Sequence, residues 1–312
     1  MSLVSRQFFA LNTTIEGGLL ADDRSGNDLF DKIELRIRNF EKRFSRFLAD
    51  SELTRLNDRA GQTVPVSRET FELLSAARLI WEKTNGLIDP LIGQALIDAG
   101  YDNSFERLDE SRPTRPAPDT KPSASFDRMK IDEPGSSVEI PKDGRLDFGG
   151  IGKGYLLDTL VSEIEVVTKD YWLALGGDLI VSGTDENGRP WQTGVQNLKN
   201  IDQNIGMIDP PIGRWGIATS STIKRRGTVG SRRWHHIVDP RTGRPAISDV
   251  IGATVLTTSA MLADAFAKAV LILGTDQGIA WTEQQPDSEA LVITTDQAIH
   301  LTSGMEKIFT KI

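Results

Sequence analysis

The sequence predicts an α+β protein in which antiparallel sheets pack against helices. Two observations predict this class. Short apolar runs of strand length are joined by tight glycine turns, as in residues 171–183, and this favours a meandering antiparallel sheet over a doubly wound parallel one. Other segments place apolar residues at helical spacing. We expect the 312 residues to form a single domain over 1–312, with a proline-rich, exposed subdomain connection near 112–126.

Composition narrows the functional classes. The net charge is −8, so no nucleic-acid partner is expected. The chain has no cysteine, which excludes disulfides, thiolate metal sites and a cysteine nucleophile. No apolar run is long enough to span a bilayer, and the first residues lack the apolar core of a signal peptide. We therefore expect a cytoplasmic protein without a transmembrane segment, or an exported one if a leader was removed.

The first hundred residues predict two strands followed by helices. Residues 8–20 form the strand pair, with Gly17-Gly18 as the turn. The first helix covers 28–47 and has Asp28 as its N-cap. Further helices are a short one capped by Asp50 or Ser51, one from Ser67 to Asn85-Gly86, and one over 91–99.

Asp89 stands before Pro90 and is therefore held extended, outside a helix interior. Its carboxylate either faces a ligand or caps the helix over 91–99, and the cap is the simpler interpretation. Residues 126–140 then predict a hairpin with its tip at 134–137.

A glycine-rich loop is the most distinctive stretch of the chain. From Leu146 to Tyr155 the sequence reads Leu-Asp-Phe-Gly-Gly-Ile-Gly-Lys-Gly-Tyr, and a helix follows. Glycines let backbone N–H groups approach a ligand, a helix N-terminus favours anions, and Lys153 adds a charge suited to phosphate. The spacing matches neither the dinucleotide fingerprint nor a Walker A loop, so a phosphate site and a tight turn with a solvated lysine both remain open.

Strands dominate the remainder of the chain. We expect them over 171–175, 179–183, 191–196, 215–224, 232–238, 290–294 and 298–302. The basic residues between 224 and 244 are Lys224, Arg225, Arg226, Arg232, Arg233, Arg241 and Arg244. Only Asp239 opposes them, which indicates a phosphate-bearing ligand or a solvated hairpin. In a strand, His235 and His236 point to opposite faces, so at most one can serve a given site as acid, base or phosphate partner.

A helix over 261–273 is expected between Ser259 as N-cap and Gly274 as its end. Its high alanine content indicates close packing. Asp264 and Lys268 are four residues apart and meet on one face of this helix. They form either a surface ion pair of little energetic weight or a carboxylate and an ammonium within a site.

Taken together, these segments resemble the ApbE family, the FAD:protein FMN transferases. The motifs occur in the order of that family. They are Phe44-Ser45-Arg46-Phe47, Ser51-Glu52-Leu53, Asp89-Pro90-Leu91, the glycine loop from Leu146 to Tyr155, Leu175-Gly176-Gly177-Asp178, Ala218-Thr219-Ser220, His236-Ile237-Val238-Asp239-Pro240-Arg241-Thr242-Gly243 and Ala263-Asp264-Ala265. The resemblance implies the α+β, T-fold-like architecture of the family.

The resemblance also implies a reaction and a site. FMN would move from FAD to a Thr or Ser hydroxyl of an acceptor flavoprotein, with release of AMP and with His236 as the catalytic histidine. FAD would contact Phe47, Asp89, Asp147, Gly149, Gly150, Lys153, Thr219, Ser220 and His236. Mg²⁺ would be held by the carbonyl groups of Gly150 and Ala267, the Asp264 carboxylate and the side chain at position 268.

The sequence departs from the family pattern in three places. Lys268 stands where the family usually has Thr, Leu11-Asn12-Thr13 replaces Met-Gly-Thr, and Ser221 replaces a common Gly. A protonated lysine cannot bind a metal ion, so Lys268 either swings away or replaces the cation beside Asp264. Three functions follow as hypotheses: an active transferase, a non-catalytic FAD-binding protein, or an FAD diphosphatase that produces FMN and AMP.

Overall fold

The computed structural model describes residues 1–99, 101, 124–223, 226–229 and 232–312. These residues form two compact units, each assembled from separate stretches of the chain. The first unit comprises Met1–Asn39, Lys153–Ser221 and Ser248–Ile312, and the second comprises Phe40–Gly152 and Thr222–Ile247. The single domain expected from the sequence stays a prediction. The connection expected near 112–126 lies mostly outside the described residues, which resume at 124.

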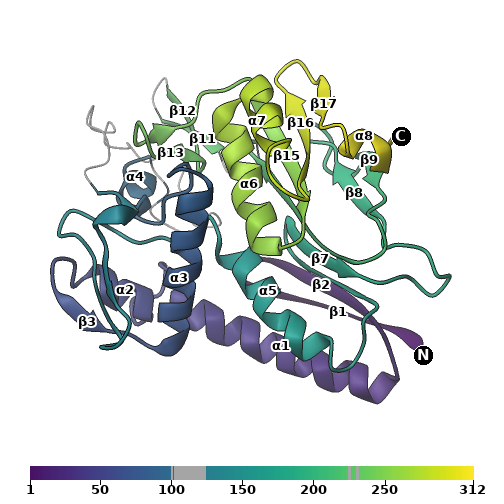
Figure 1. The fold of residues 1–312 in the computed structure, drawn as a ribbon, viewed down its shortest axis with the longest axis horizontal. Coiled ribbons are helices and arrows are strands. Elements are labelled where there is room, and N and C mark those ends of the chain that lie inside the picture. Colours follow the sequence, from purple (N-terminus) through teal and green to yellow (C-terminus); the bar gives the residue numbers. More distant parts are fainter. Residues whose placement is uncertain (100, 102–123, 224–225, 230–231) are drawn as a thin grey trace. The chain divides into compact units, whose positions relative to one another are not determined.

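An antiparallel sheet is the framework of the first unit (Figure 1). Among the described residues it has eight strands, and all neighbouring strands are antiparallel. Their spatial order is β1 (Ser2–Ala10), β2 (Thr13–Ala21), β6 (Tyr171–Leu175), β7 (Asp178–Ser182), β10 (Arg214–Ser221), β15 (Val250–Thr257), β16 (Glu289–Thr294) and β17 (Ile299–Leu301). The predicted α+β class with antiparallel sheets is confirmed.

The N-terminal strand pair forms, but the turn expected at Gly17-Gly18 is wrong. Strands β1 and β2 turn at Leu11 and Asn12, whose φ angles are 54° and 53°. Both glycines lie inside β2, where a Cβ on Gly17 would stand 2.9 Å from a ring carbon of Phe30. A Cβ on Gly18 would collide with the indole of Trp172. These glycines therefore make room for aromatic rings and do not supply a turn.

Helices α1 (Asp23–Phe44), α5 (Gly152–Ile164), α6 (Ala260–Leu273) and α7 (Thr275–Thr282) accompany the sheet. The N-cap of α1 is Asp22, whose Oδ1 accepts a hydrogen bond from the Ser25 amide at 3.0 Å, so the expected cap at Asp28 is wrong. The α6 caps are confirmed. The Ser259 side chain accepts from the Leu262 amide, and Gly274 ends the helix. Helix α6 packs against β10 and β15.

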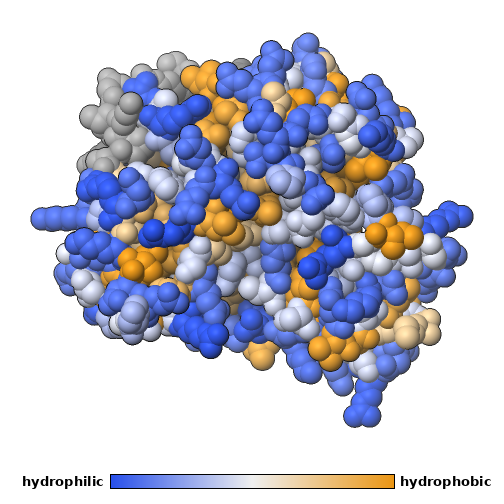
Figure 2. All heavy atoms as spheres, viewed as in Figure 1, coloured by the Kyte–Doolittle hydropathy of each residue, from blue (hydrophilic) through white to orange (hydrophobic). Residues whose placement is uncertain are grey.

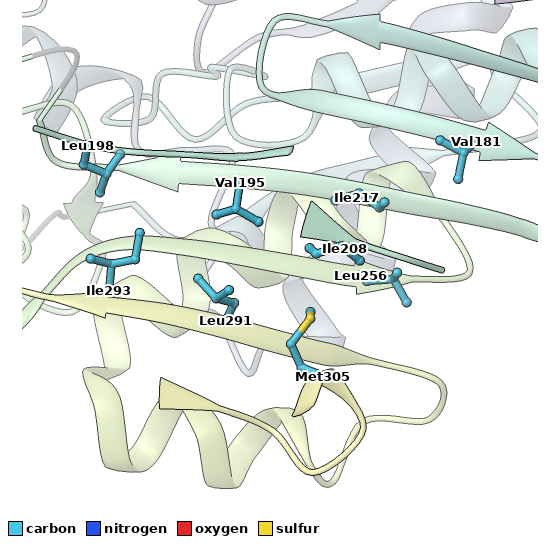
Figure 3. Packing of buried hydrophobic residues seen from close by; sticks show 9 residues of the cluster. All are labelled: Val181, Val195, Leu198, Ile208, Ile217, Leu256, Leu291, Ile293 and Met305. Carbon is cyan, nitrogen blue, oxygen red and sulfur yellow. The ribbon is translucent and has the colours of Figure 1, made fainter. Parts of the chain in front are cut away.

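The first unit buries an apolar cluster between its main sheet and a smaller sheet (Figure 3). The smaller sheet consists of β18 (Phe309–Lys311), β9 (Asn204–Ile208) and β8 (Thr193–Gln196). The strand expected over 191–196 therefore forms outside the main sheet. The cluster joins residues of both sheets to Met305 of α8 (Met305–Ile308), and its other members are Val181, Val195, Leu198, Ile208, Ile217, Leu256, Leu291 and Ile293. Burial of these side chains supplies hydrophobic stabilisation to the unit.

The second unit contains the shorter helices and hairpins. Its helices are α2 (Glu52–Asn57), α3 (Arg68–Lys83), α4 (Gly93–Asp98) and the 3₁₀ turn η2 (Phe126–Arg128). Its strands are β3 (Thr63–Pro65), β4 (Lys130–Asp132), β5 (Ser137–Glu139), β11 (Arg226–Val229), β12 (Arg232–His235), β13 (Val238–Asp239) and β14 (Arg244–Pro245). The cap at Ser51, the helix start at Ser67 and the hairpin within 126–140 are confirmed, and Ser67 is the N-cap of α3. The strand expected over 232–238 breaks after His235.

Polar residues cover most of the face drawn in Figure 2, and apolar residues appear there as scattered patches. Within the described part of the chain, no helix combines the length and the apolar character that crossing a membrane requires.

Gly154 is required by packing between α5 and α6. A Cβ at this position would lie 2.6 Å from the Cα of Met261 and still closer to the backbone of Ala260. Backbone atoms cannot move aside as a flexible side chain would. One glycine of the loop motif is therefore a packing residue, and no ligand is needed to explain it.

We expect Gly154→Ala to lower the free energy of unfolding by about 1–3 kcal/mol, because the added methyl group overpacks this contact. Gly152→Ala is the matched control, since its Cβ would meet ring and side-chain carbons only at 3.6 Å. The control should change stability by less than about 0.5 kcal/mol. Urea unfolding followed by circular dichroism measures both, and equal midpoints for the two variants would contradict the packing role.

Candidate functional site

The glycine loop begins in the second unit, where buried polar contacts fix its first residues. The Asn57 side chain donates to the Leu146 carbonyl at 2.9 Å and accepts from the Leu146 amide at 2.7 Å. The Asp147 amide donates to the Pro90 carbonyl at 2.7 Å. Asp147 Oδ1 in turn accepts from the Gly149 amide at 2.7 Å. The loop is thus preorganised before any ligand binds.

Arg46 lies against two aromatic rings of the second unit. Its guanidinium carbon is 4.6 Å from the ring centroid of Phe47 and 4.4 Å from that of Tyr101. Arg46 Nε donates to Asp147 Oδ2 at 3.1 Å, and its Nη2 is buried without a hydrogen-bond partner among the described residues. The Tyr101 ring centroid is also 6.2 Å from that of His236. We call Arg46, Phe47, Tyr101 and His236 the aromatic cluster, which can offer ring faces to a planar ligand.

Asp89 has a structural role that neither sequence interpretation anticipated. Its Oδ1 accepts from the Leu91 amide at 2.8 Å and its Oδ2 from the Phe126 amide at 3.1 Å. Helix α4 begins at Gly93 and has no side-chain cap, so the expected cap at Asp89 is wrong. Burial raises the pKa of Asp89, and the two backbone donors oppose that rise. A contact between Asp89 and FAD stays a prediction.

The two adjacent histidines have different surroundings. His236 lies in the bend after β12, with its ring beside Tyr101. His235 Nε2 lies 3.0 Å from the Ala246 carbonyl oxygen, so this nitrogen carries the proton of the neutral ring. His235 Nδ1 is buried and has no partner in the described structure. His236 is therefore the better placed of the two for chemistry.

We expect His235 to make the protein sensitive to mild acid. Burial lowers the pKa of His235, because protonation would place a second N–H group at the buried, unpartnered Nδ1. The unfolded chain takes up this proton below about pH 6.5 while the folded state resists it, so stability is lost as pH falls. Urea unfolding at several pH values from 7 to 5 should show a steeper loss for wild type than for His235→Gln. His300→Gln, which changes an exposed histidine, should retain the wild-type slope, and parallel slopes for wild type and His235→Gln would contradict this account.

The first unit holds two lysine–aspartate pairs. The Lys153 ammonium, in the first turn of α5, bonds Asp178 Oδ2 at the start of β7. The Lys268 ammonium bonds Asp264 Oδ1 and also donates to the Asp264 carbonyl oxygen at 3.1 Å. Asp178 is 2% exposed and Asp264 is fully buried. We call these four residues the paired-charge cluster.

Local structure fixes both aspartates of the cluster. Asp178 follows the two-residue turn Gly176-Gly177, where Gly176 has a φ of 65° that favours glycine. Asp264 is held by α6, whose N-terminus is anchored by Asp158 of α5. The Asp158 carboxylate accepts from the Ser259 hydroxyl at 2.6 Å and from the amides of Ala260 and Met261.

Electrostatic coupling links the two pairs. Burial, followed by the nearby Asp178 carboxylate, raises the pKa of Asp264. The ammonium groups of Lys268 and Lys153 oppose this rise. The predicted meeting of Asp264 and Lys268 is confirmed, and the surface ion-pair interpretation is wrong, because their side chains are 1% and 14% exposed. Buried charges of this kind are a common feature of functional sites.

The donor set at Asp264 does not fit a magnesium ion. Mg²⁺ needs oxygen ligands, whereas position 268 supplies an ammonium that already bonds one Asp264 oxygen. Asp264 Oδ2 is buried without a partner among the described residues, but a divalent cation there would adjoin the Lys268 charge and be repelled. Ala267 is fully buried within α6. The described residues also contain no group of three or more His, Cys, Asp or Glu side chains suited to a metal.

Thr219 and Ser220 lie on β10 in the same unit. The Thr219 amide donates to the Gly177 carbonyl at 2.9 Å, which places Thr219 beside the turn that precedes Asp178. Its hydroxyl is 2.9 Å from that of Thr254. Ser220 is buried. Their contact with FAD stays a prediction.

Sequence reasoning missed two residues of these clusters. Asp178 is part of the motif Leu175-Gly176-Gly177-Asp178 but was given no role in the site, although an acid at the first position of an apolar strand can signal a buried partner. Tyr101 belongs to no motif in the sequence that would mark it as a site residue.

The described part of the basic segment between residues 224 and 244 contains an ion pair with good geometry. Arg241 pairs with Asp239 through two hydrogen bonds, with Nε–Oδ1 and Nη2–Oδ2 distances of 2.9 Å. Lys224 and Arg225 lie outside the described residues, so a phosphate ligand at this segment stays a prediction.

Solved structures with the same fold are ApbE proteins. The ApbE protein of Thermotoga maritima superposes with a TM-score of 0.88 at 25% identity, covering 98% of this chain and 99% of that chain. The flavin transferase ApbE from Vibrio cholerae has a TM-score of 0.78 at 23% identity and likewise covers 98% and 99%. The fold is thus that of the ApbE proteins.

The chain belongs to the ApbE family, whose model matches residues 11–292. A protein from Vibrio cholerae named FAD:protein FMN transferase is 25% identical over 284 residues, which is 89% of this chain and 82% of the relative. A protein of the same name from Treponema pallidum is 29% identical over 282 residues, with coverages of 82% and 74%. The expected family resemblance is confirmed.

Proposed function

We propose that this chain is an FAD:protein FMN transferase, which moves FMN from FAD to a Thr or Ser hydroxyl of an acceptor flavoprotein and releases AMP. The observation that carries the proposal is the family match over residues 11–292, which includes every residue proposed here for the site. The names of the curated relatives support the same activity.

The reaction exchanges one phosphorus–oxygen bond for another. The hydroxyl oxygen of the acceptor bonds the FMN phosphorus, and the bond from this phosphorus to the bridging oxygen of the diphosphate breaks. AMP leaves with the bridging oxygen, and the hydroxyl proton passes to a base. The step requires positive charge near the phosphates and a group that accepts the proton.

Lys153 and Lys268 are proposed to donate hydrogen bonds to the diphosphate oxygens. Lys153 and Lys268 are held in place by Asp178 and Asp264, so their ammonium groups are oriented before FAD binds. A preorganised cation stabilises developing negative charge without the cost of reorientation during the reaction. Thr219 and Ser220 of β10 are proposed to contact FAD from the same unit.

The aromatic cluster is proposed to supply aromatic surface and a base. The flavin ring is proposed to contact Phe47 of the aromatic cluster, and His236 is proposed to take the proton of the attacking hydroxyl. Gly150 is loosely surrounded, because a Cβ there would meet only one side-chain carbon, at 3.7 Å. Asp147 and Gly149 shape the loop that carries it.

The test uses a flavoprotein domain that carries a candidate acceptor threonine, with the same domain carrying Thr→Val as control. This chain, incubated with FAD and the acceptor, should make the acceptor band fluorescent after denaturing electrophoresis, and the Thr→Val domain should stay dark. AMP release that is independent of the acceptor would favour the diphosphatase hypothesis. FAD binding without any AMP release would favour the binding-protein hypothesis.

A further inference from the structure

Lys268 is confined by the packing of α6. Ala263, Ala265, Ala267 and Ala269 on this helix are all fully buried, so the helix is closely surrounded. The Lys268 side chain is only 14% exposed, and its ammonium turns back onto Asp264 of the same helix. If Lys268 swung away, the fully buried Asp264 carboxylate would lose its charged partner. This arrangement favours the alternative in which the lysine itself acts as the cation.

The Lys268 ammonium still has donor capacity for a ligand. An ammonium has three N–H donors, and both acceptors that it reaches among the described residues belong to Asp264. One donor therefore remains for an oxygen from outside the protein. Phosphate oxygens accept strong charge-assisted hydrogen bonds from lysine.

We propose that the Lys268 ammonium replaces the divalent cation at Asp264, so that this chain binds the FAD diphosphate without Mg²⁺. The proposal rests on the proposed function, because it assigns Lys268 to the same ligand. The Lys268 ammonium occupies Asp264 Oδ1, the oxygen that a divalent cation would otherwise bind. A magnesium ion added to the present pair would meet a second cation.

The experiment measures FAD binding by isothermal titration calorimetry in EDTA and again in excess Mg²⁺. For wild type we expect the dissociation constants for FAD in EDTA and in Mg²⁺ to agree within about threefold. Lys268→Thr supplies an oxygen in place of the ammonium. Its FAD affinity should fall by about tenfold or more in EDTA and recover by a similar factor in Mg²⁺.

Two further variants sharpen the result. Lys268→Met removes the charge without supplying an oxygen, so its affinity should be weak in both buffers. Lys169→Thr breaks an exposed pair of the same i,i+4 spacing, with Glu165, and should bind as wild type does. Wild-type binding that is lost in EDTA and restored by Mg²⁺ would overturn the proposal, even if the position 268 variants failed to fold. These measurements record FAD binding and not turnover. They therefore test the role of Lys268 even if the protein does not transfer FMN.

Discussion

Replacing His236 with asparagine is expected to lower the rate of FMN transfer by about 10²–10⁴-fold, the usual contribution of a general base. His236 lies in a bend and its ring is beside Tyr101, so the substitution leaves the sheets of both units unchanged. FAD affinity should fall by a much smaller factor than the rate, because His236 is only one of the proposed FAD contacts. Single-turnover assays with saturating acceptor measure the rate, and calorimetry measures the affinity.

His300→Asn is the matched control for this prediction. His300 is exposed on β17 in the first unit, a strand that carries none of the proposed site residues. Transfer by this variant should equal that of wild type. A His236→Asn enzyme that retains transfer within a few fold of wild type would remove His236 from the role of base.

Lys153→Met is expected to cost about 3–5 kcal/mol of folding stability, because it leaves the buried Asp178 carboxylate without its partner. Asp178 is only 2% exposed, so water cannot replace the lysine. FAD binding should also weaken, since one of the two proposed phosphate-binding cations is lost. Urea unfolding and calorimetry measure the two effects separately.

The double variant Lys153→Met/Asp178→Asn separates stability from ligand binding. It removes both charges, so most of the lost stability should return, while FAD binding should stay weak. Lys169→Met is the control for a surface pair. Its ammonium is paired with Glu165 and is largely exposed, so its effect should be below about 1 kcal/mol. If Lys153→Met were as stable as this control, the buried Lys153–Asp178 pair would not contribute the stability expected here.

Features with local causes could be predicted from the sequence. Ser51 and Ser259 cap their helices as expected, because each needs only an amide three residues ahead. The Asp264–Lys268 contact is local for the same reason. The ordered family motifs predicted the fold that the comparisons confirm.

Features that depend on distant neighbours could not be predicted in this way. Gly17 and Gly18 resemble a turn, and only the rings of Phe30 and Trp172 explain why they lie within a strand. The buried strand β15 has no predicted counterpart, because it is covered on both faces and shows no alternation. The burial of the Asp264–Lys268 pair depends on the elements that pack around α6. The sequence of α6 alone does not indicate which elements these are.

The measurement that tests the central claim most directly is the ratio of AMP released to FMN bound covalently on the acceptor. Wild-type protein, FAD and acceptor domain would be incubated together, with AMP quantified by chromatography and acceptor-bound FMN by intact mass spectrometry. A transferase predicts one bound FMN for each AMP throughout the time course. AMP matched by free FMN, with no flavin on the acceptor, would contradict the account and assign the site to hydrolysis.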